Sequence, residues 1–437
     1  MTVQTSLEWA ATIPNGWRVV PLKRVCKFTT GWTPPTGDSA AYVGDNLWAN
    51  ISDVGPRVIR DTAKRLSDDA VKRHSIALSP AGSLLFSFKL SVGQVSFAGE
   101  DMFTNEAIAT FLPSHALDLN FAYYAFPEMI VRNATENIYG AKILNQQLIN
   151  SAPLVLPPRP EQTAIAAFLD RETGKIDALV EEQRRLIELL KEKRLAVISH
   201  AVTKGLDPNA RMKPSRVEWL RDVPEHWDVT RLKFVAVVQT GTAKGKDLAG
   251  QTTIKVPYLR VANVQDGYID LSDVAEIEVP VSDLNRYLLR QGDVLMNEGG
   301  DFDKLGRGGI WDGSIDPCIH QNHVFAVRPN GVLPEWLNMV TSSAYGRFYF
   351  MSRSKQSTNL ASISSTNVME LPLALPPAGE QALILDWLAG QLTRIRALEE
   401  QCNGSVSLLL ERRSALISSA VTGKIDVRDV VVREVAA

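Results

Sequence analysis

One stretch of this sequence occurs twice, at a constant spacing. The segment 156–203 begins Leu-Pro-Pro-x-x-Glu-Gln and ends Ala-Val-Thr, and the segment 375–422 begins and ends with the same residues. The matching positions are 219 residues apart (375 − 156), without a gap. Such a fixed offset indicates an internal duplication, and a duplicated chain favours a partner or a target that also has two parts.

The duplication extends to the start of each half, at a different spacing. Residues Trp17, Leu22-Lys23 and Thr30-Gly31 recur as Trp227, Leu232-Lys233 and Thr240-Gly241, 210 residues later (227 − 17). Because the offset grows from 210 to 219, the second half carries nine more residues (219 − 210) in its middle. The sequence therefore predicts two divergent domains that are mounted on a common frame.

The composition is that of a globular protein. At 437 residues the chain is long enough for two or three domains, and 45% hydrophobic content is ordinary. No apolar run could span a bilayer, and residues 1–11 lack the features of a secretion signal, so we expect a cytoplasmic protein without a membrane partner. Cys26, Cys318 and Cys402 are too few and too widely spaced for a disulfide framework or a cysteine metal cluster.

The net charge gives little information on the partner. A formal charge of −2 argues weakly against a strongly basic nucleic-acid-binding protein. It does not exclude DNA binding, because counterion release depends on the local density of Lys and Arg and not on the total charge.

The middle of each half is predicted to mix strands and loops. Short apolar runs at 83–86, 92–97, 293–296 and 323–327 are bounded by Gly, Pro, Asn or Asp, which is typical of strands. Helical segments are expected around 120–132 and 334–350. The glycine-rich segment 299–309 is expected to form a loop, because glycine destabilises the interior of a helix or strand.

The duplicated segment predicts a long helix in each half. Residues 161–203 contain no proline, and apolar residues recur at steps of three and four, as in a coiled-coil seam. A helix of this length would extend roughly 60 Å and would expose its apolar stripe unless the second copy covered it. We expect antiparallel pairing through Ile176, Leu179, Leu186, Leu190, Val197, Ile395, Leu398, Leu409 and Leu416. The alternative is two independent helices, each lying on its own domain.

These elements predict an α+β chain with pseudo-two-fold symmetry. Two tandem mixed α/β domains would each be followed by a long helix, and the two helices would form an antiparallel coiled coil. The expected division is a first domain at 1–158, a helix at 159–205, a second domain with its linker at 206–377, a helix at 378–426 and a tail at 427–437.

Catalytic and cofactor motifs are missing from this sequence. The segment 241–247 resembles a phosphate loop, but its glycines are one residue too close and Asp247 stands where Ser or Thr would hold magnesium. His320 and His323 lack a third metal ligand nearby. We therefore expect no catalytic residue, no metal site and no cofactor in this chain.

The divergent domains do carry side chains that suit base edges and phosphates. Arg and Lys pair with guanine, Asn and Gln pair with adenine, and all of them can contact phosphate. Any single one of them can instead be an ordinary solvated loop residue. The candidates in the second half are Asn297, Lys304, Arg307, Gln321, Asn322, His323, Arg353, Lys355, Gln356 and Asn359, and those in the first half are Trp32, Lys89, Gln94, Asn105, Lys142 and Asn145.

These patterns resemble the specificity subunit of type I restriction-modification enzymes. The resemblance covers nearly the whole chain, and its most specific part is the duplicated Pro-Pro-x-x-Glu-Gln run that opens a long helix. Residues 303–308 (Asp-Lys-Leu-Gly-Arg-Gly) and 320–325 (His-Gln-Asn-His-Val-Phe) also resemble one version of that family's target recognition domain. The middle of the first half matches no such version.

The resemblance implies a non-catalytic role in a larger complex. Each recognition domain would bind one half of a split, asymmetric target in double-stranded DNA. The paired helices would set the spacing between the half-sites and would bind two methyltransferase subunits, and restriction (motor-nuclease) subunits would join them. S-adenosylmethionine, ATP and magnesium would act on those partners. On this view, inserting four residues near Leu186 should lengthen the spacer and leave both half-sites unchanged.

Two other functions remain open at this point. The chain could be an orphan DNA-binding scaffold, which would be purified without a methyltransferase even when the two are co-expressed. It could also be an enzyme with a nuclease or methyltransferase hidden in a divergent domain, in which case the chain alone would cleave or methylate DNA.

Overall fold

The computed structural model describes residues 13–245, 248–300, 305–306, 308–356 and 361–427. The chain forms two compact units, Met1–Gln183 with Gly404–Ala437, and Arg184–Asn403. The unit boundaries lie inside the two long helices α4 (Arg159–Lys204) and α9 (Ala378–Val421), so that each unit contains half of each helix.

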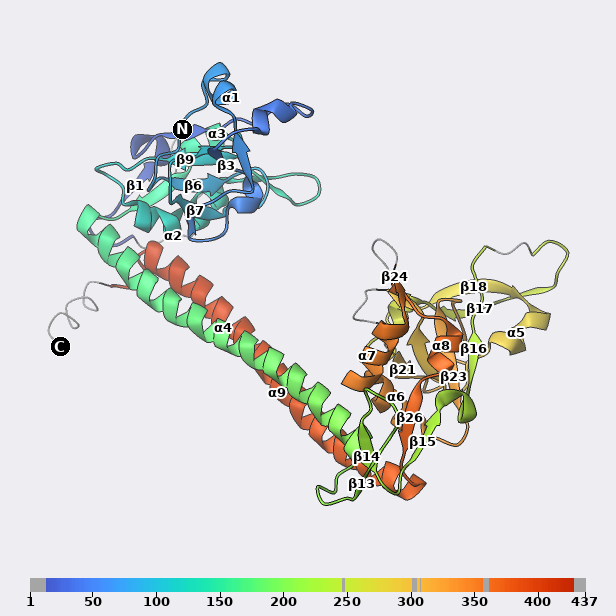
Figure 1. Cartoon of the computed structure of the whole chain (residues 1–437). Helices are drawn as coiled ribbons and strands as arrows, with labels where there is room; N and C mark the ends of the chain where they lie inside the picture. The colour runs from blue at the N-terminus through green and yellow to red at the C-terminus, as the bar shows by residue number, and fades with distance from the viewer. Residues whose placement is uncertain (1–12, 246–247, 301–304, 307, 357–360, 428–437) are drawn as a thin grey trace. The chain divides into compact units, whose positions relative to one another are not determined.

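Unit 1 is built on a five-stranded sheet in the order β2-β9-β6-β7-β4, with a second sheet in the order β5-β3-β8 (Figure 1). Its strands are β1 (Arg18–Pro21), β2 (Phe28–Thr30), β3 (Asn46–Ala49), β4 (Val58–Ile59), β5 (Lys64–Leu66), β6 (Leu84–Ser87), β7 (Val95–Ala98), β8 (Phe103–Thr104), β9 (Ile108–Phe111), β10 (Thr135–Glu136), β11 (Lys142–Ile143) and β12 (Pro153–Leu156). Its shorter helices are α1 (Asp68–Arg73), α2 (Leu119–Met129) and α3 (Gln146–Ser151).

Unit 2 has a four-stranded sheet in the order β16-β23-β19-β21 and three-stranded sheets in the orders β18-β17-β22 and β20-β25-β24. Its strands are β13 (Met212–Pro214), β14 (Asp222–Pro224), β15 (Asp228–Arg231), β16 (Ala236–Thr240), β17 (Thr253–Leu259), β18 (Ala275–Pro280), β19 (Val294–Asn297), β20 (Gly299–Gly300), β21 (Gly308–Ile310), β22 (Ile319–His320), β23 (Val324–Pro329), β24 (Lys355–Gln356), β25 (Ala361–Ser362) and β26 (Pro372–Leu375). Its shorter helices are α5 (Val281–Tyr287), α6 (Pro334–Ser342), α7 (Ala344–Arg353) and α8 (Ser365–Met369).

The two units share one topology, although their middle sequences have diverged. The sheet order β2-β9-β6-β7 of unit 1 recurs as β16-β23-β19-β21, and the order β5-β3-β8 recurs as β18-β17-β22. The strand next to each long helix also recurs, since β1 pairs antiparallel with β12 and β15 pairs antiparallel with β26. The duplication seen at the ends of each half therefore extends through the whole unit, with β4 as an addition in unit 1.

The repeated Thr-Gly pair has a steric cause in both units. A Cβ atom on Gly31 would lie 1.6 Å from the Thr104 carbonyl oxygen, and one on Gly241 would lie 2.0 Å from the His320 carbonyl oxygen. The residue after each glycine donates its amide proton to that same carbonyl. Only glycine permits this close approach between neighbouring strands.

Most predicted elements form, and the glycine-rich segment is a correction. The four apolar runs correspond to β6, β7, β19 and β23, and the helical segment at 334–350 is divided into α6 and α7. However, Gly299–Gly300 and Gly308–Ile310 are short strands, where a loop was expected throughout 299–309. A Cβ atom on Gly308 would lie 2.1 Å from the Leu295 carbonyl oxygen, so glycine lets this strand pair closely with β19.

The two long helices pair antiparallel within each unit, as expected. In unit 1 the end of α9 shares the hydrophobic core with the start of α4, through Val421 and Ile165, and further along Arg413 contacts Asp177 at 2.8 Å. In unit 2, Leu190 of α4 packs with Ile395 and Cys402 of α9. Each helix therefore covers the other, and the alternative of two independent helices is excluded.

The inward positions of both helices follow one heptad pattern, at the same offset of 219 residues (392 − 173). They are buried or half-buried: Thr173, Ile176, Val180, Gln183, Ile187, Leu190, Arg194, Val197 and Ala201 in α4, and Leu392, Ile395, Glu399, Cys402, Val406, Leu409, Arg413, Leu416 and Ala420 in α9. Six of the nine residues expected to pair the helices lie on this stripe.

Three of the expected pairing residues do not lie on the stripe. Leu179, Leu186 and Leu398 are 45%, 42% and 46% exposed. Three residues after Ile176 lies Leu179, and four residues after it lies Val180. These two positions lie on opposite sides of the seam, and both are apolar, so the spacing alone does not say which one faces the partner helix. The helices turn Val180 and Ile187 inward instead.

Both helices begin and end in the same way. The carbonyl of the second proline accepts amide protons of the Glu-Gln pair, from Glu161 and Gln162 to Pro158 in α4 and from Glu380 and Gln381 to Pro377 in α9. A glycine with positive φ follows each helix, Gly205 (φ 73°) and Gly423 (φ 77°). Among the helices of the described residues, none is long and apolar enough to cross a membrane.

Candidate nucleic-acid interface

The glutamines of the duplicated motif join each long helix to its recognition domain. In unit 1, Gln162 accepts the amide proton of Asp118, just before α2, at 2.8 Å and donates to the Pro157 carbonyl at 2.9 Å. In unit 2, Gln381 accepts the amide proton of Leu333, just before α6, at 3.4 Å and donates to the Pro376 carbonyl at 2.9 Å. Both side chains are buried, so these bonds fix the angle at which helix and domain meet.

Each unit also has a cavity where the C-terminal half of a long helix faces its recognition domain. The cavity of unit 2 has a volume of about 390 Å³ and that of unit 1 about 290 Å³. Equivalent helix positions line both, since Lys191, Arg194, Leu195 and Ile198 of α4 correspond to Leu410, Arg413, Ser414 and Ile417 of α9. The two contacts between a long helix and a domain thus lie at equivalent positions, but different side chains form them.

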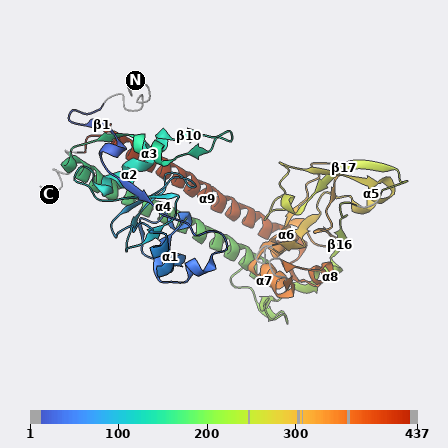
Figure 2. The ribbon, with the colours of Figure 1, turned by 90° about the horizontal axis from the view of Figure 1, so that it is seen from above.

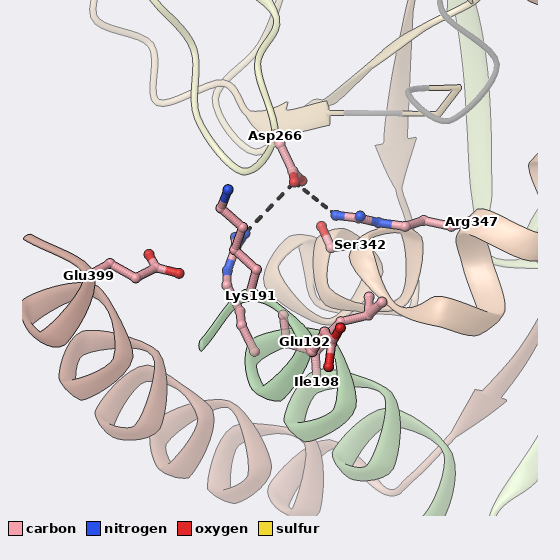
Figure 3. A pocket seen from close by; sticks show the side chains of 9 residues that line it. Lys191, Glu192, Ile198, Asp266, Ser342, Arg347 and Glu399 are labelled. Atoms are coloured by element: carbon pink, nitrogen blue, oxygen red, sulfur yellow. Dashed lines mark hydrogen bonds and ion pairs between the residues drawn. The ribbon is translucent and has the colours of Figure 1, made fainter. Parts of the chain in front are cut away.

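In unit 2 the junction is an ionic bridge. The carboxylate of Asp266 lies 2.8 Å from Arg347 of α7 and 3.7 Å from Arg194 of α4 (Figure 3). Figure 3 shows Asp266 reaching toward the guanidinium group of Arg347, while Glu399 lies on the neighbouring helix α9. The bridge connects a loop and a helix of the domain with α4.

In unit 1, Tyr123 and Tyr124 of α2 line the cavity, and Tyr124 also joins the domain to the other long helix, α4. Tyr124 of α2 donates to Asp170 of α4 at 2.6 Å, and Arg57 reaches the same carboxylate at 2.7 Å. The Arg57 guanidinium also lies 4.7 Å from the centre of the Tyr123 ring. Burial and the hydrogen bond to Asp170 raise the pKa of Tyr124, so the phenol stays protonated as a donor. No motif in the sequence indicates this cluster.

Several sequence-predicted contact residues of unit 2 gather at one end of the sheets. Glu298 connects them, because its amide donates to the His323 carbonyl and its own carbonyl accepts from Ile363, next to β25. The strands β20, β25 and β24 pair with one another, which brings Lys355 and Gln356 beside this position. The side chains that are exposed here are Lys355, Gln356, Arg353 and His323. Those of Gln321 and Asn322 are half-buried.

Some of these side chains already have partners within unit 2. His323 contacts Glu298 at 2.8 Å, and the Gln321 amide oxygen accepts from the Val261 amide at 3.4 Å. Asn322 lies 3.3 Å from His323. Lys304, Arg307 and Asn359 lie outside the described residues.

Three of the predicted asparagines have structural roles. Asn297 is buried and donates to the Val264 carbonyl at 3.0 Å. Asn105 is buried and accepts the Ala107 amide proton at 3.0 Å. Asn145 caps α3 by accepting the Leu148 amide proton at 2.8 Å. For these three, backbone hydrogen bonding explains the residue without DNA.

The remaining candidates of unit 1 are more dispersed. Trp32 is half-buried and stacks on His74, with ring centres 4.0 Å apart. Lys89 is exposed and lies 3.5 Å from Glu106. Burial would raise the pKa of Glu106, but the hydrogen bond from Thr33 and the charge of Lys89 hold it below its ordinary value. Gln94 and Lys142 are exposed.

The two histidines considered as metal ligands do not converge. His320 is fully buried, and its Nδ1 lies 2.8 Å from the Val324 carbonyl oxygen, whereas His323 is exposed and paired with Glu298. Within the part of the chain that the structure describes, no group of three or more His, Cys, Asp or Glu residues could hold a metal ion. Burial raises the pKa of the Cys26 and Cys318 thiols to about 12, so both stay protonated and unreactive.

Comparison with known proteins shows which proteins this chain resembles. A family model described as type I restriction modification DNA specificity domain matches residues 14–189. The type I restriction enzyme EcoKI specificity subunit of Escherichia coli (strain K12) is 22% identical over 446 residues, which cover 95% of this chain and 90% of that protein. The StySPI specificity subunit of Salmonella potsdam is 23% identical over 438 residues, which cover 94% of this chain and 90% of that protein.

A solved structure has the same fold over almost the whole chain. It comes from a study of complex assembly and conformational transition of the type I R-M system. It covers 95% of this chain and 100% of its own, with a TM-score of 0.70 and 16% sequence identity. The matched domain model and the two relatives, which align over nearly their full length, show that this chain is similar to the DNA specificity subunits of type I restriction-modification systems.

Proposed function

We propose that this chain selects the DNA sequence for a type I restriction-modification complex and has no catalytic activity of its own. Each recognition domain would bind one half of a bipartite, asymmetric target in double-stranded DNA. The observation that carries this proposal is that one topology occurs twice, with different side chains at corresponding places. A repeated frame with divergent surfaces suits two different half-sites, since bases are distinguished by side chains and not by the frame.

The contact residues proposed for unit 2 are those at the end of the sheets where β24 and β25 pair. Arg353, Lys355 and Gln356 are exposed there, and Lys304, Arg307 and Asn359 are added from the sequence alone. In unit 1 we propose Lys89, Gln94 and Lys142, which are exposed. Arg and Lys at these positions would supply guanine and phosphate contacts, and Gln would supply adenine contacts.

The paired helices would carry two methyltransferase subunits. Leu189 of α4 is 50% exposed and its counterpart Leu408 of α9 is 68% exposed, 219 positions later (408 − 189). Leu179 and Leu398 form a second exposed pair with the same offset. Each unit therefore has equivalent exposed leucines on its helix pair, which suits two copies of one partner. Restriction subunits would join this assembly, and S-adenosylmethionine, ATP and magnesium would be bound by the partners.

The proposal is tested by mapping methylated adenines in cells that express this chain with a type I methyltransferase subunit. We expect one bipartite motif with a fixed non-specific spacer, and no methylation when either protein is expressed alone. Exchange of the recognition domain of unit 2 for that of a relative should change one half of the motif only.

Other results would contradict the proposal in distinct ways. Purification of the chain without a methyltransferase, with retained sequence-specific DNA binding, would indicate an orphan scaffold. Methylation or cleavage by the purified chain alone would indicate an enzyme. A methylated motif that consists of one continuous sequence, without a spacer, would contradict the assignment of one half-site to each unit.

A further inference from the structure

The most exposed large apolar side chains among the described residues lie next to each other. Ile138 is 90% exposed and Tyr139 is 87% exposed, and both lie between β10 and β11 of unit 1. The next value along this scale is 76%, for Val43. The β10–β11 hairpin extends away from the body of unit 1, as the label β10 shows in Figure 2. Contiguous, strongly exposed apolar side chains often mark a binding site.

The backbone of this hairpin tip is held in a defined shape. The Asn137 side-chain oxygen accepts the amide protons of Tyr139 and Ala141, both at 2.9 Å. The Asn137 amide donates to the Ala141 carbonyl at 3.0 Å, and Gly140 adopts a φ of 75° that few other residues tolerate. The tip is therefore preorganised, and its two apolar side chains need little further ordering to bind.

The hairpin corresponds to the part of unit 2 that carries predicted DNA contacts. The hairpin β10–β11 is followed by α3, capped by Asn145, and then by β12. The pair β24–β25 is followed by α8, capped by Ser364, and then by β26. Lys355 and Gln356 form β24. Ile138 and Tyr139 therefore belong to the surface that would bind DNA in the other unit.

The size and charge of the tip indicate how it would bind. A stable protein partner needs about 800 Å² on each side, far more than two side chains provide. Wedging between two base pairs needs only one or two apolar side chains. Glu136 and Lys142 are paired across the hairpin, so the strands beside the tip add no net charge for phosphate binding. An apolar tip on a stem whose charges balance suits the base stack better than the phosphate backbone.

We propose that Ile138 and Tyr139 form a wedge that enters the base stack of the half-site bound by unit 1 and unstacks one base step. This inference rests on the proposed function, because it requires unit 1 to bind duplex DNA. The wedge selects sequence through deformability, since pyrimidine–purine steps unstack most easily. It also explains how unit 1 recognises DNA although Asn105 and Asn145 are occupied by backbone hydrogen bonds.

The test begins with the full-length chain and a library of random-sequence duplexes, from which the bound sequences define both half-sites. A duplex of that target then carries 2-aminopurine at each adenine of the unit 1 half-site in turn. We expect the wild-type chain to raise the fluorescence at one step only. The double variant Ile138→Ala, Tyr139→Ala should lose this signal and bind about 10- to 100-fold more weakly, as expected for loss of an inserted ring.

Matched variants distinguish an inserted wedge from a phosphate contact and from a general loss of apolar surface. Tyr139→Trp should keep the fluorescence signal, because a larger ring still inserts, and Val43→Ala should behave as wild type. The slope of log affinity against log salt should be the same for the double variant and the wild type, because no phosphate contact is lost. A smaller slope, or unchanged affinity of the double variant, would overturn the proposal.

Two further outcomes have separate meanings. If the double variant binds DNA normally but no longer co-purifies with a methyltransferase, the tip binds a protein and the wedge is wrong. If the wild-type chain selects no bipartite sequence from the library, the proposed function fails, whatever the variants do.

Discussion

Gln162 and Gln381 make two equivalent hydrogen bonds in the two halves of the chain, and Gln162 also donates to the Ala116 carbonyl at 3.0 Å. Each accepts a backbone amide proton from the residue before a helix of the recognition domain and donates to the carbonyl of the first proline of the Pro-Pro pair. The contact in unit 2 is longer, 3.4 Å against 2.8 Å, so unit 1 is held more tightly at this junction.

Replacing Gln162 by Ala should destabilise unit 1 by about 1–3 kcal/mol, because a buried amide and a carbonyl would lose their partner. Gln381→Ala should act on unit 2 and have the smaller effect, since its accepted bond is longer. Thermal unfolding followed by circular dichroism measures both, with exposed Gln147→Ala as the control. Equal unfolding temperatures for Gln162→Ala and the control would show that the junction does not depend on this side chain.

The stability of unit 2 should depend on pH through His320. Burial lowers the pKa of His320 from 6.5 to about 4. The unfolded chain therefore binds the proton first, so stability is complete above about pH 6.5 and falls as the pH drops toward 4, by about 3 kcal/mol. Urea unfolding at pH 4.5 and 7.5 measures this loss, and His320→Asn should reduce it.

The carboxylate of Asp118 does not account for a loss in that window. Burial acts to raise the pKa of Asp118, but the hydrogen bond from Thr163 lowers it below its ordinary value. The stability that this group contributes is therefore lost only at lower pH. If His320→Asn loses as much stability as the wild type between pH 6.5 and 4.5, another group is responsible.

Asp266→Asn should weaken the junction between α4 and the recognition domain of unit 2. The change removes the negative charge shared by Arg194 and Arg347. The Asp266 side chain is 36% exposed, so solvent screening limits the expected loss to about 1 kcal/mol. Urea midpoints at low and high salt measure it, and the difference from wild type should shrink in salt.

A matched ion pair provides the control for that change. Asp273→Asn removes the partner of Arg260 within the same unit, and Asp273 is 83% exposed. We expect little change in the midpoint from this variant. A loss equal to that of Asp266→Asn would mean that the junction contributes nothing beyond an ordinary surface pair.

Changes at the exposed helix leucines should remove methyltransferase subunits one at a time. We expect Leu189→Ser or Leu408→Ser alone to leave one copy of the partner bound, and the double variant to leave none. Native mass spectrometry of the co-expressed complex counts the copies. Phe234→Ser, which replaces an exposed apolar residue (69%) outside the helices, should keep both copies. Two bound copies on the double variant would place the docking surface elsewhere.

Lengthening both helices should lengthen the DNA spacer. Seven residues inserted after Leu186 and seven after Ser405 keep the heptad stripe aligned and add about 10 Å, which corresponds to about three base pairs. The methylome should show the same half-sites farther apart. Four residues added to α4 alone rotate its stripe by about 40° and should weaken the pairing as well. An unchanged spacer with the heptad insertions would refute the ruler role of the helices.

The sequence alone determined the duplication, the two long helices and the resemblance to type I specificity subunits. The constant offset and the Pro-Pro-x-x-Glu-Gln run are local patterns, and the helix bounds near 159 and 378 follow from proline, glycine and apolar spacing. The apolar runs that became β6, β7, β19 and β23 were also visible, because strands buried on both faces are continuous in sequence.

Only the tertiary structure decided which side chains face inward and which remain available. Leu179 and Val180 are adjacent and both apolar, so only the contact with the partner helix determines which of them is buried. Asn105, Asn145 and Asn297 look like base contacts in the sequence, but the folded backbone uses their amide groups. The exposed tip at Ile138 and Tyr139 gave no motif, because exposure is a property of the packed chain and not of the residues themselves.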